Sequence, residues 1–266
     1  MELIGPDHAS YDVLRRPALP QYDHIRPQAV ALCTTPEDVA EALAYARSQG
    51  LQVVPRGGGH CFAGRSSTTG VQLDLSPMSS VSVQDARATI GAGARLASVY
   101  RELHEYGLTL PAGCGPTVGI VGLTLGGGLG LLGRKYGLTC DRLVGATVVL
   151  ADGNVVECDA ERAADLFWAL RGAGGGQFGV VTSLVYDAVP SPTATRFRVT
   201  WPRSRAADVI DAWQTWAPDA PDGITASLSV TADGVEVFGA ALVPFDPSPL
   251  PEGDVELRDD LSWPDL

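Results

Sequence analysis

The chain has 266 residues, of which 45% are hydrophobic, and a formal net charge of −12 at pH 7. This length is sufficient for a large core and more than one domain, whereas the negative charge would repel nucleic acid and anionic membrane surfaces. The sequence contains no apolar run of roughly 20 residues, the length that spans a bilayer, and its start lacks the apolar stretch of a secretion signal. We therefore expect a soluble, cytoplasmic protein that uses neither nucleic acid nor a membrane as a partner.

The first elements along the chain are predicted to alternate helix and strand. Thr35 is a suitable N-cap, Pro36 is a suitable first helical residue, and the apolar residues that follow have helical spacing up to about Gly50. The stretches LQVVP and VQLDL, which lie on either side of the glycine-rich segment RGGGH, are typical of buried strands. This pattern predicts a small α/β lobe over residues 1–82, with His60 in a loop that leaves a strand.

Antiparallel sheet is predicted to dominate over residues 83–190. VSVQ and ATIGAG suggest paired strands, and RLASVYRELHEYG and ADLFWALRG have helical spacing. LVGATVVL and NVVEC flank Asp152-Gly153, a dipeptide suited to a type I′ turn, and FGVVTSLVYDAV returns to strand. The fold class expected for residues 1–190 is thus α+β, with two lobes that together form one domain.

A second unit is predicted after the proline-containing segment PSPT. RFRVTW, the helical VIDAWQTW and the hairpin ITASLSVTADGVEVFGAALV suggest a partial antiparallel α+β domain over residues 191–245. Trp201, Trp213 and Trp216 are expected in the core of this domain, with a role in an interface as the alternative. Residues 246–266 are rich in proline and acidic residues, a composition that predicts an irregular tail.

Two segments match the pattern G-x-G-x-x-G, namely Gly128, Gly130 and Gly133, and Gly174, Gly176 and Gly179. A dinucleotide-binding fold would need a parallel strand after the helix that the glycines open. The acidic residue nearest the expected distance, Asp152, lies instead in the predicted hairpin turn, and the second run leads directly into a strand. We therefore reject a nicotinamide site and expect the glycine runs to bring backbone N–H groups close to a phosphate.

Four groups of motifs occur in order along residues 25–190. They are PRGGGHCFAG, the pair LDLSPMSSV and GAGARL, the long LPAGCGPTVGIVGLTLGGGLGLLGRKYGLTCDRL, and DLFWALRGAGGGQFGVVTS. Together they resemble the FAD-linked oxidase family, the vanillyl-alcohol oxidase type of flavoprotein, and within it the berberine-bridge-enzyme-like branch. The resemblance implies a two-lobed PCMH-type FAD-binding domain, with glycine-rich loops around the pyrophosphate and residues 174–181 near the flavin ring.

The residues that the resemblance assigns to FAD lie in these loops. They are Arg56, Gly57, Gly58, Gly59, His60, Cys114, Thr117, Gly119, Gly122, Thr124, Gly127, Gly128, Gly130 and Val181. His60 occupies the position that bonds to the 8α-methyl carbon of the flavin in the family, and a neutral imidazole is the nucleophile that this bond requires. The alternative is a loop histidine that only hydrogen-bonds a carbonyl group, but the flanking glycines favour the covalent role.

A second covalent link to the flavin, which bicovalent members of the branch have, is not expected. Those members carry a cysteine immediately before Pro-Thr-Val-Gly, where this chain has Gly115, and Cys114 lies one residue earlier. A shift of one residue along an extended segment reverses the direction of a side chain. Cys114 is therefore expected to be an inert, small thiol in the core, and the five cysteines, which form no CxxC pair, predict neither disulfides nor a zinc site.

The resemblance implies an oxidase that transfers hydride from a small organic substrate to covalent FAD, with dioxygen as acceptor. An alcohol, a sugar or a secondary-metabolite intermediate would each suit this chemistry. The catalytic residues are unknown; Tyr136 is a candidate base by its place in the sequence, with packing as the more common role. Complete members of the family continue through a full substrate domain, so the alternative is a truncated or degenerate flavin-binding module. Such a module would need a protein partner or self-association to cover an unfinished sheet.

Overall fold

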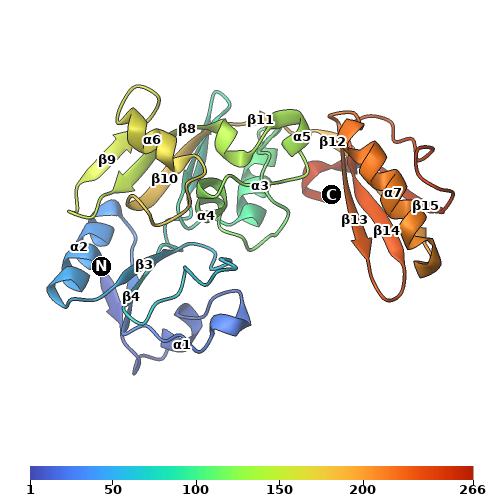
Figure 1. The fold of residues 1–266 in the computed structure, drawn as a ribbon. Coiled ribbons are helices and arrows are strands. Elements are labelled where there is room, and N and C mark those ends of the chain that lie inside the picture. The colour runs from blue at the N-terminus through green and yellow to red at the C-terminus, as the bar shows by residue number, and fades with distance from the viewer. Residues whose placement is uncertain (266) are drawn as a thin grey trace.

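The computed structural model describes residues 1–265, which form two lobes in contact with each other and a third, C-terminal unit beside them (Figure 1). The first lobe contains a mixed sheet in which β1 runs antiparallel to the other three strands. In spatial order its strands are β1 (Glu2–Ile4), β2 (Ala29–Leu32), β4 (Val71–Asp74) and β3 (Val53–Arg56). The segment between the first two strands contains the short helix α1 (Tyr11–Leu14) and the 3-10 turn η1 (Pro20–Tyr22).

The second lobe is built on an antiparallel sheet, as the sequence predicts. In spatial order its strands are β5 (Val81–Gln84), β6 (Arg87–Gly91), β10 (Val180–Asp187), β8 (Leu143–Val149) and β9 (Val155–Cys158). A separate pair joins β7 (Leu108–Thr109) to β11 (Val189–Pro190). The helical elements are α3 (Leu96–His104), α4 (Ile120–Leu125), α5 (Gly133–Tyr136), the 3-10 turn η2 (Thr139–Arg142) and α6 (Ala164–Leu170).

The two lobes share one hydrophobic core. Helix α2 (Pro36–Ser48) contacts β4 of the first lobe and β8 of the second. A continuous cluster of buried side chains runs from one lobe to the other and includes Val39, Leu73, Ile90, Ile120 and Leu184. Because each lobe buries apolar surface against the other, close packing fixes their relative position.

Helix α2 begins where the sequence predicts. Oγ1 of Thr35 accepts a hydrogen bond from the backbone N–H of Asp38 at 3.3 Å, and Oδ2 of Asp38 accepts one from the N–H of Thr35 at 3.2 Å. This reciprocal capping box satisfies donors at the start of the helix, and Pro36 follows at the first helical position.

The C-terminal unit is an antiparallel sheet with α7 (Ala206–Trp216) packed on one face (Figure 1). Its strands, in spatial order, are β13 (Ile224–Val230), β14 (Val235–Ala241), β12 (Thr193–Trp201) and β15 (Asp254–Ser262). The 3-10 turns are η3 (Arg203–Arg205), η4 (Ala217–Asp219) and η5 (Trp263–Asp265). Trp201 is buried in the core of this unit, and Trp213 and Trp216 pack against the same core.

The segment after residue 245 is not wholly irregular, which corrects the expectation from the sequence. Strand β15 adds to the edge of the sheet beside β12, with Val255 opposite Val199 and Leu257 opposite Phe197. An added strand is held mainly by main-chain hydrogen bonds, so a polar composition does not prevent its formation. Val255 and Leu257 nevertheless remain 47% and 45% exposed. Residue 266 lies outside the described residues.

The turn between β8 and β9 also differs from the expected type. Gly153 has a φ of 93°, but Asp152 is not among the residues with positive φ. A type I′ turn needs positive φ at both central positions. Asp85 and Ala86 meet this requirement, with φ values of 48° and 64°, in the turn between β5 and β6. The hairpin itself was predicted correctly, but its turn type was wrong.

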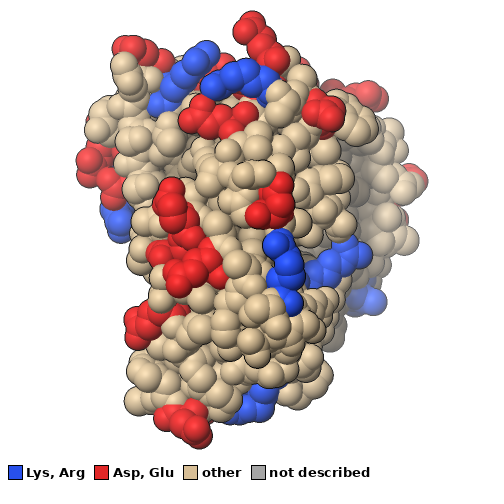
Figure 2. Space-filling view, turned by 90° about the vertical axis from the view of Figure 1, so that its left-hand side faces the viewer, with Lys and Arg blue, Asp and Glu red and all other residues tan. Residues whose placement is uncertain are grey.

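Acidic side chains are spread over the face of the two lobes that carries α2 and α6 (Figure 2). Basic side chains lie among them and do not merge into one continuous patch on this face. Within residues 1–265, no helix is long and apolar enough to cross a membrane, and no group of three or more His, Cys, Asp or Glu is placed to hold a metal ion.

Candidate functional site

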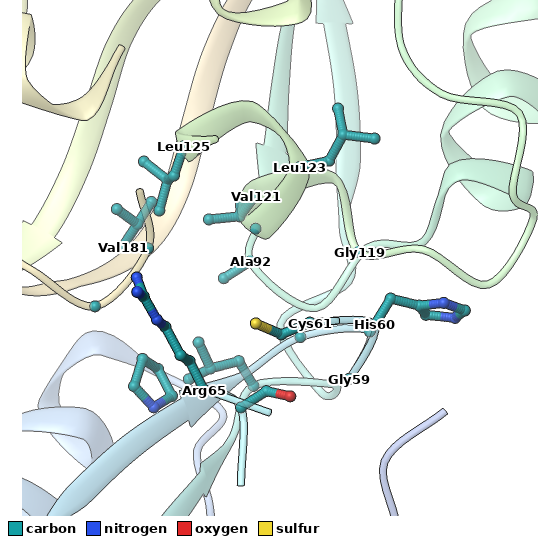
Figure 3. Close-up of a pocket in the computed structure, with 18 of the residues that line it drawn as sticks. Gly59, His60, Cys61, Arg65, Ala92, Gly119, Val121, Leu123, Leu125 and Val181 are labelled. Atoms are coloured by element: carbon teal, nitrogen blue, oxygen red, sulfur yellow. The ribbon is translucent and has the colours of Figure 1, made fainter. Parts of the chain in front are cut away.

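A cavity of about 550 Å³ lies between the two lobes (Figure 3). One wall is the loop that follows β3 and runs from Gly57 to Ser66, and a second is the segment 118–125, which includes α4. Gly174 to Gly179 and Val181 of β10 complete the lining. The volume lies within the range of sites for small molecules and cofactors, about 300 to 1,000 Å³.

The first two walls meet through glycine backbone. A Cβ atom on Gly58 would lie 2.3 Å from the backbone nitrogen of Gly119, and a Cβ atom on Gly119 would lie 2.5 Å from the nitrogen of Gly58. No side chain can be accommodated at either position without moving one of the loops. Gly58 of the first glycine run and the isolated Gly119 are therefore both needed for one shared contact beside the cavity.

His60 marks one end of the cavity. Its Nε2 atom lies 2.9 Å from Oγ1 of Thr117, so the histidine of the first loop is held by a residue of the second wall. Figure 3 shows the imidazole ring directed away from Leu125 and Val181, which lie at the other end. A polar, nucleophilic group thus borders a cavity whose opposite end is apolar.

Arg56 directly precedes the glycines but does not line the cavity. Its buried guanidinium donates hydrogen bonds to the carbonyl oxygen of Ser66 at 2.9 Å, to Oγ of Ser67 at 3.1 Å and to the carbonyl oxygen of Arg15. Burial lowers the pKa of Arg56 to about 10, so the side chain is still a cation at neutral pH. Arg56 therefore holds the two ends of the cavity loop together and ties them to the N-terminal segment.

The cavity collects about half of the residues that the sequence assigns to FAD. Those that line it are Gly57, Gly58, Gly59, His60, Gly119, Gly122 and Val181. Thr117 reaches it only through its hydrogen bond to His60. Those outside the lining are Arg56, Cys114, Thr124, Gly127, Gly128 and Gly130.

Two glycines of the 127–130 segment, Gly128 and Gly130, are in close contact with neighbouring segments. A Cβ atom on Gly128 would lie 2.3 Å from Oγ1 of Thr139, and one on Gly130 would lie 1.9 Å from the carbonyl oxygen of Ala112. These contacts require glycine at both positions, whatever ligand the segment borders. Cys114 is exposed, which corrects the expectation of a core position, and it also lies outside the cavity.

Tyr136 is not placed to act as a base in the cavity. Nζ of Lys135 lies 5.3 Å from the centre of its ring, and the guanidinium carbon of Arg142 lies 5.8 Å from it. The tyrosine is absent from the lining of the cavity. Its contacts are those of a packing residue with cation–π neighbours.

Three lining residues, Cys61, Phe62 and Arg65, were not expected from the sequence. They follow His60 in the same loop, so their position was the available signal. Figure 3 shows the Arg65 guanidinium extending toward Val181, and Arg65 makes no ion pair with a carboxylate of the described chain. A cation without a carboxylate partner beside apolar walls is suited to an anionic ligand group.

The C-terminal unit is anchored to the second glycine-rich segment. The Arg134 guanidinium donates to the carbonyl oxygens of Ala217 at 2.8 Å and Pro218 at 3.2 Å, and also to that of Ala220. These carbonyl groups follow α7, in η4 and at its C-cap, where a cation is favoured. Oγ1 of Thr225 donates to the carbonyl oxygen of Leu131 at 2.7 Å. Both contacts connect the segment 126–137 to the C-terminal unit.

The cavity has the features that FAD requires. Glycine backbone offers close approach for a diphosphate, Arg65 offers a positive charge, and the apolar segments offer surface for flat rings. A family model described as an FAD binding domain matches residues 27–159, half of the chain. The FAD-linked oxidoreductase YgaK of Bacillus subtilis, described as uncharacterised, is 43% identical over 209 residues that cover 76% of this chain.

Solved structures resemble the chain over nearly its whole length. The BBE-like 1 protein of Physcomitrella patens has a TM-score of 0.90 at 30% identity, covering 97% of this chain and 60% of that protein. A glucooligosaccharide oxidase from Acremonium strictum, whose description names a 6-S-cysteinyl, 8α-N1-histidyl FAD, has a TM-score of 0.85 at 35% identity. The match covers 91% of this chain and 52% of that oxidase. The chain spans 46% of the length of YgaK, about half. It belongs to the FAD-linked oxidoreductase family that is defined by this FAD binding domain.

Proposed function

We propose that the chain holds FAD in the cavity between its lobes and that His60 bonds to the 8α carbon of the flavin. The observation that carries this proposal is the place of His60, at the end of a glycine-lined cavity, directly after the Gly57–Gly59 loop. The backbone N–H groups of the loops and the Arg65 guanidinium are the proposed donors to the diphosphate.

The position of His60 also suggests the direction in which FAD lies. Val181 and His60 occupy opposite ends of the cavity in Figure 3. A flavin ring bonded to His60 would therefore extend the remainder of the cofactor toward Val181. We assign residues 174–181 to that remainder rather than to the flavin ring, which replaces the expectation drawn from the sequence.

For the whole protein we propose oxidation of a small organic substrate, such as an alcohol, a sugar or a secondary-metabolite intermediate. Bound FAD would accept a hydride from the substrate and pass the electrons to dioxygen. The name of the glucooligosaccharide oxidase among the relatives favours a carbohydrate. We assign no residue of the described chain as the catalytic base. The cytoplasmic location is proposed from composition alone.

A second candidate is a flavin-binding module that depends on a further polypeptide. Strand β15 forms an edge of the C-terminal sheet, and its Val255 and Leu257 side chains are 47% and 45% exposed. Exposed apolar residues on an edge strand are normally covered. In this case the chain alone would bind FAD but would not turn over substrate.

An absorbance spectrum of the purified protein before and after acid precipitation tests the first proposal. Flavin bands that stay with the precipitate, and that are lost in His60→Ala, would support a bond at His60. His104→Ala is the matched control, because His104 is exposed on α3 outside the cavity, and its flavin content should equal that of the wild type. A protein that stays colourless after incubation with FAD would refute FAD binding. Peroxide production with candidate sugars and alcohols then separates the oxidase from the module.

A further inference from the structure

The contact between His60 and Thr117 is held from both sides. A Cβ atom on Gly58 would lie 2.8 Å from the carbonyl oxygen of Thr117, so the backbones of the two loops are in close contact here. On the other side, the carbonyl oxygens of Pro116 and Val118 each accept a hydrogen bond of 3.0 Å from the first residues of α3. Thr117 therefore lies between two neighbours that are hydrogen-bonded to α3. The backbone thus holds the Thr117 hydroxyl group 2.9 Å from Nε2 of His60.

This contact distinguishes the two nitrogens of the imidazole. Nε2 faces the Thr117 hydroxyl, whereas Nδ1 has no hydrogen-bond partner within residues 1–265. A neutral imidazole has one N–H donor and one nitrogen with a free lone pair. When the proton is on Nε2, Thr117 accepts it in a hydrogen bond and the lone pair is on Nδ1. The Thr117 hydroxyl group can also donate to Nε2 in the other tautomer, but only the tautomer with the proton on Nε2 leaves a lone pair on Nδ1 for attack on a carbon atom.

We infer that Thr117 is a positioning residue that directs attachment of the flavin to Nδ1 of His60. The inference rests on the proposed function, because it assumes that His60 bonds to the flavin. Attack by Nδ1 places positive charge on the imidazole, and the hydrogen bond from Nε2–H to Oγ1 of Thr117 becomes charge-assisted and stronger. The hydroxyl group therefore favours the step in which Nδ1 forms the bond, because it accepts from Nε2–H as positive charge develops on the ring.

The bond between protein and cofactor requires an oxidant, which we take to be dioxygen. A bond forms between Nδ1 and the 8α carbon, the methyl group loses one proton, and the imidazole loses the proton of Nε2. Two electrons pass from the reacting carbon to the flavin and then to dioxygen. One hydrogen peroxide is formed for each bond made, so atoms and electrons balance.

The glucooligosaccharide oxidase of Acremonium strictum is described with FAD on histidine N1, the atom called Nδ1 here. That description concerns the linkage in a relative and is silent on what selects the nitrogen. In this chain the selection is assigned to one hydroxyl group. A purely structural role for Thr117 would predict that its loss weakens folding or FAD binding without changing the nitrogen that reacts.

The test compares wild type, Thr117→Ser and Thr117→Val, each as the full chain. Thr117→Ser keeps the hydroxyl group, and Thr117→Val keeps the shape but removes the oxygen. Acid-stable flavin is followed over time after FAD is added, non-covalent binding is followed by quenching of flavin fluorescence, and the linked nitrogen is identified by NMR of the isolated flavin peptide. We expect Thr117→Val to slow attachment about tenfold or to give linkage at both nitrogens, with non-covalent affinity within about twofold of wild type.

Each outcome decides the inference. Attachment in Thr117→Val at the wild-type rate and through Nδ1 alone would overturn it, as would a Thr117→Ser variant as slow as Thr117→Val. If Thr117→Val does not fold, Thr117→Ala, which also lacks the hydroxyl group, takes its place in the same comparison, and linkage of the wild type through Nε2 would overturn the inference in either case. Absence of acid-stable flavin in the wild type would instead refute the bond to His60 itself, so the two failures are distinguishable.

Discussion

The hydroxyl oxygen of Tyr186 lies 2.7 Å from Oγ1 of Thr124, and both side chains are completely buried. Oγ1 of Thr124 donates to the carbonyl oxygen of Ile120 at 2.8 Å, so Tyr186 is the donor in the pair. The contact connects α4, a wall of the cavity, to the C-terminal end of β10. Burial raises the pKa of Tyr186, which keeps the phenol protonated over the range in which the protein would be studied.

The direction of this hydrogen bond predicts unequal effects for its two partners. Tyr186→Phe leaves Thr124 bonded to Ile120 and should lower the free energy of unfolding by about 1 kcal/mol. Thr124→Val leaves the buried Tyr186 hydroxyl without a partner and should lower it by about 1 to 3 kcal/mol. Urea denaturation of the two variants measures the difference. A larger effect of Tyr186→Phe would show that the donor has been assigned incorrectly.

Gly119 and Gly122 provide a matched pair of substitutions in one segment of the cavity wall. Gly119→Ala should prevent correct folding or FAD binding, because its Cβ atom would lie 2.5 Å from the backbone nitrogen of Gly58. Gly122→Ala meets no atom within 4 Å and lies inside α4, where alanine is favoured over glycine by about 0.5 to 1 kcal/mol. We expect Gly122→Ala to be at least as stable as wild type in thermal unfolding. Equal stability of the two variants would contradict the close contact.

Arg65→Gln should weaken binding of FAD but not of riboflavin, which has no phosphate. The loss expected for one charge-assisted hydrogen bond is about tenfold or more in Kd. Fluorescence titration in a His60→Ala background measures equilibrium binding without a covalent bond. Arg101→Gln, a change of an exposed arginine outside the cavity, is the control. If riboflavin binding falls as much as FAD binding, Arg65 supports the loop rather than the diphosphate.

Thiol labelling at pH 8 should separate the five cysteines into two groups. Burial raises the pKa of Cys33 to about 12 and that of Cys158 to about 11, and it also raises the pKa of Cys140. At a pH well below these values the thiolate, which is the reactive form, is scarce. Iodoacetamide should therefore modify Cys61 and Cys114 in the folded protein, as detected by peptide mass spectrometry.

Bound FAD should change the labelling of one of these two accessible cysteines and not that of the other. Cys61 lines the cavity and Cys114 does not, so saturation with FAD should protect Cys61 and leave labelling of Cys114 unchanged. Protection of Cys114 alone would place the cofactor elsewhere and would contradict the site.

The elements with strong local signals could be predicted from the sequence. The helix that begins after Thr35 and the strands on either side of RGGGH follow from capping and periodicity, and the structure confirms them. The family follows from the order of several motifs. Local pattern was less informative where partners distant in sequence decide the outcome, as for β15, whose strand conformation depends on pairing with β12.

The composition of the cavity shows the same distinction. The glycine-rich segments 57–59 and 126–130 cannot be distinguished by composition. Gly58 nevertheless borders the cavity, whereas Gly130 packs against the carbonyl group of Ala112. Only the three-dimensional arrangement tells these two uses apart. Cys61 and Arg65 belong to no repeated pattern, so their role in the lining depends on how the loop is folded and not on any periodic signal.

The contact of Gly58 with Gly119 has a consequence for how such a protein can diversify. The two loops are in contact there through peptide groups and not through side chains. Substitution of either glycine would therefore disrupt the contact instead of altering the ligand that the cavity binds. Variation is instead open at the neighbouring positions that carry side chains into the cavity, such as Phe62, Arg65 and Leu123. Descendants of this sequence could therefore change their ligand by single substitutions at these positions while they keep the contact between Gly58 and Gly119.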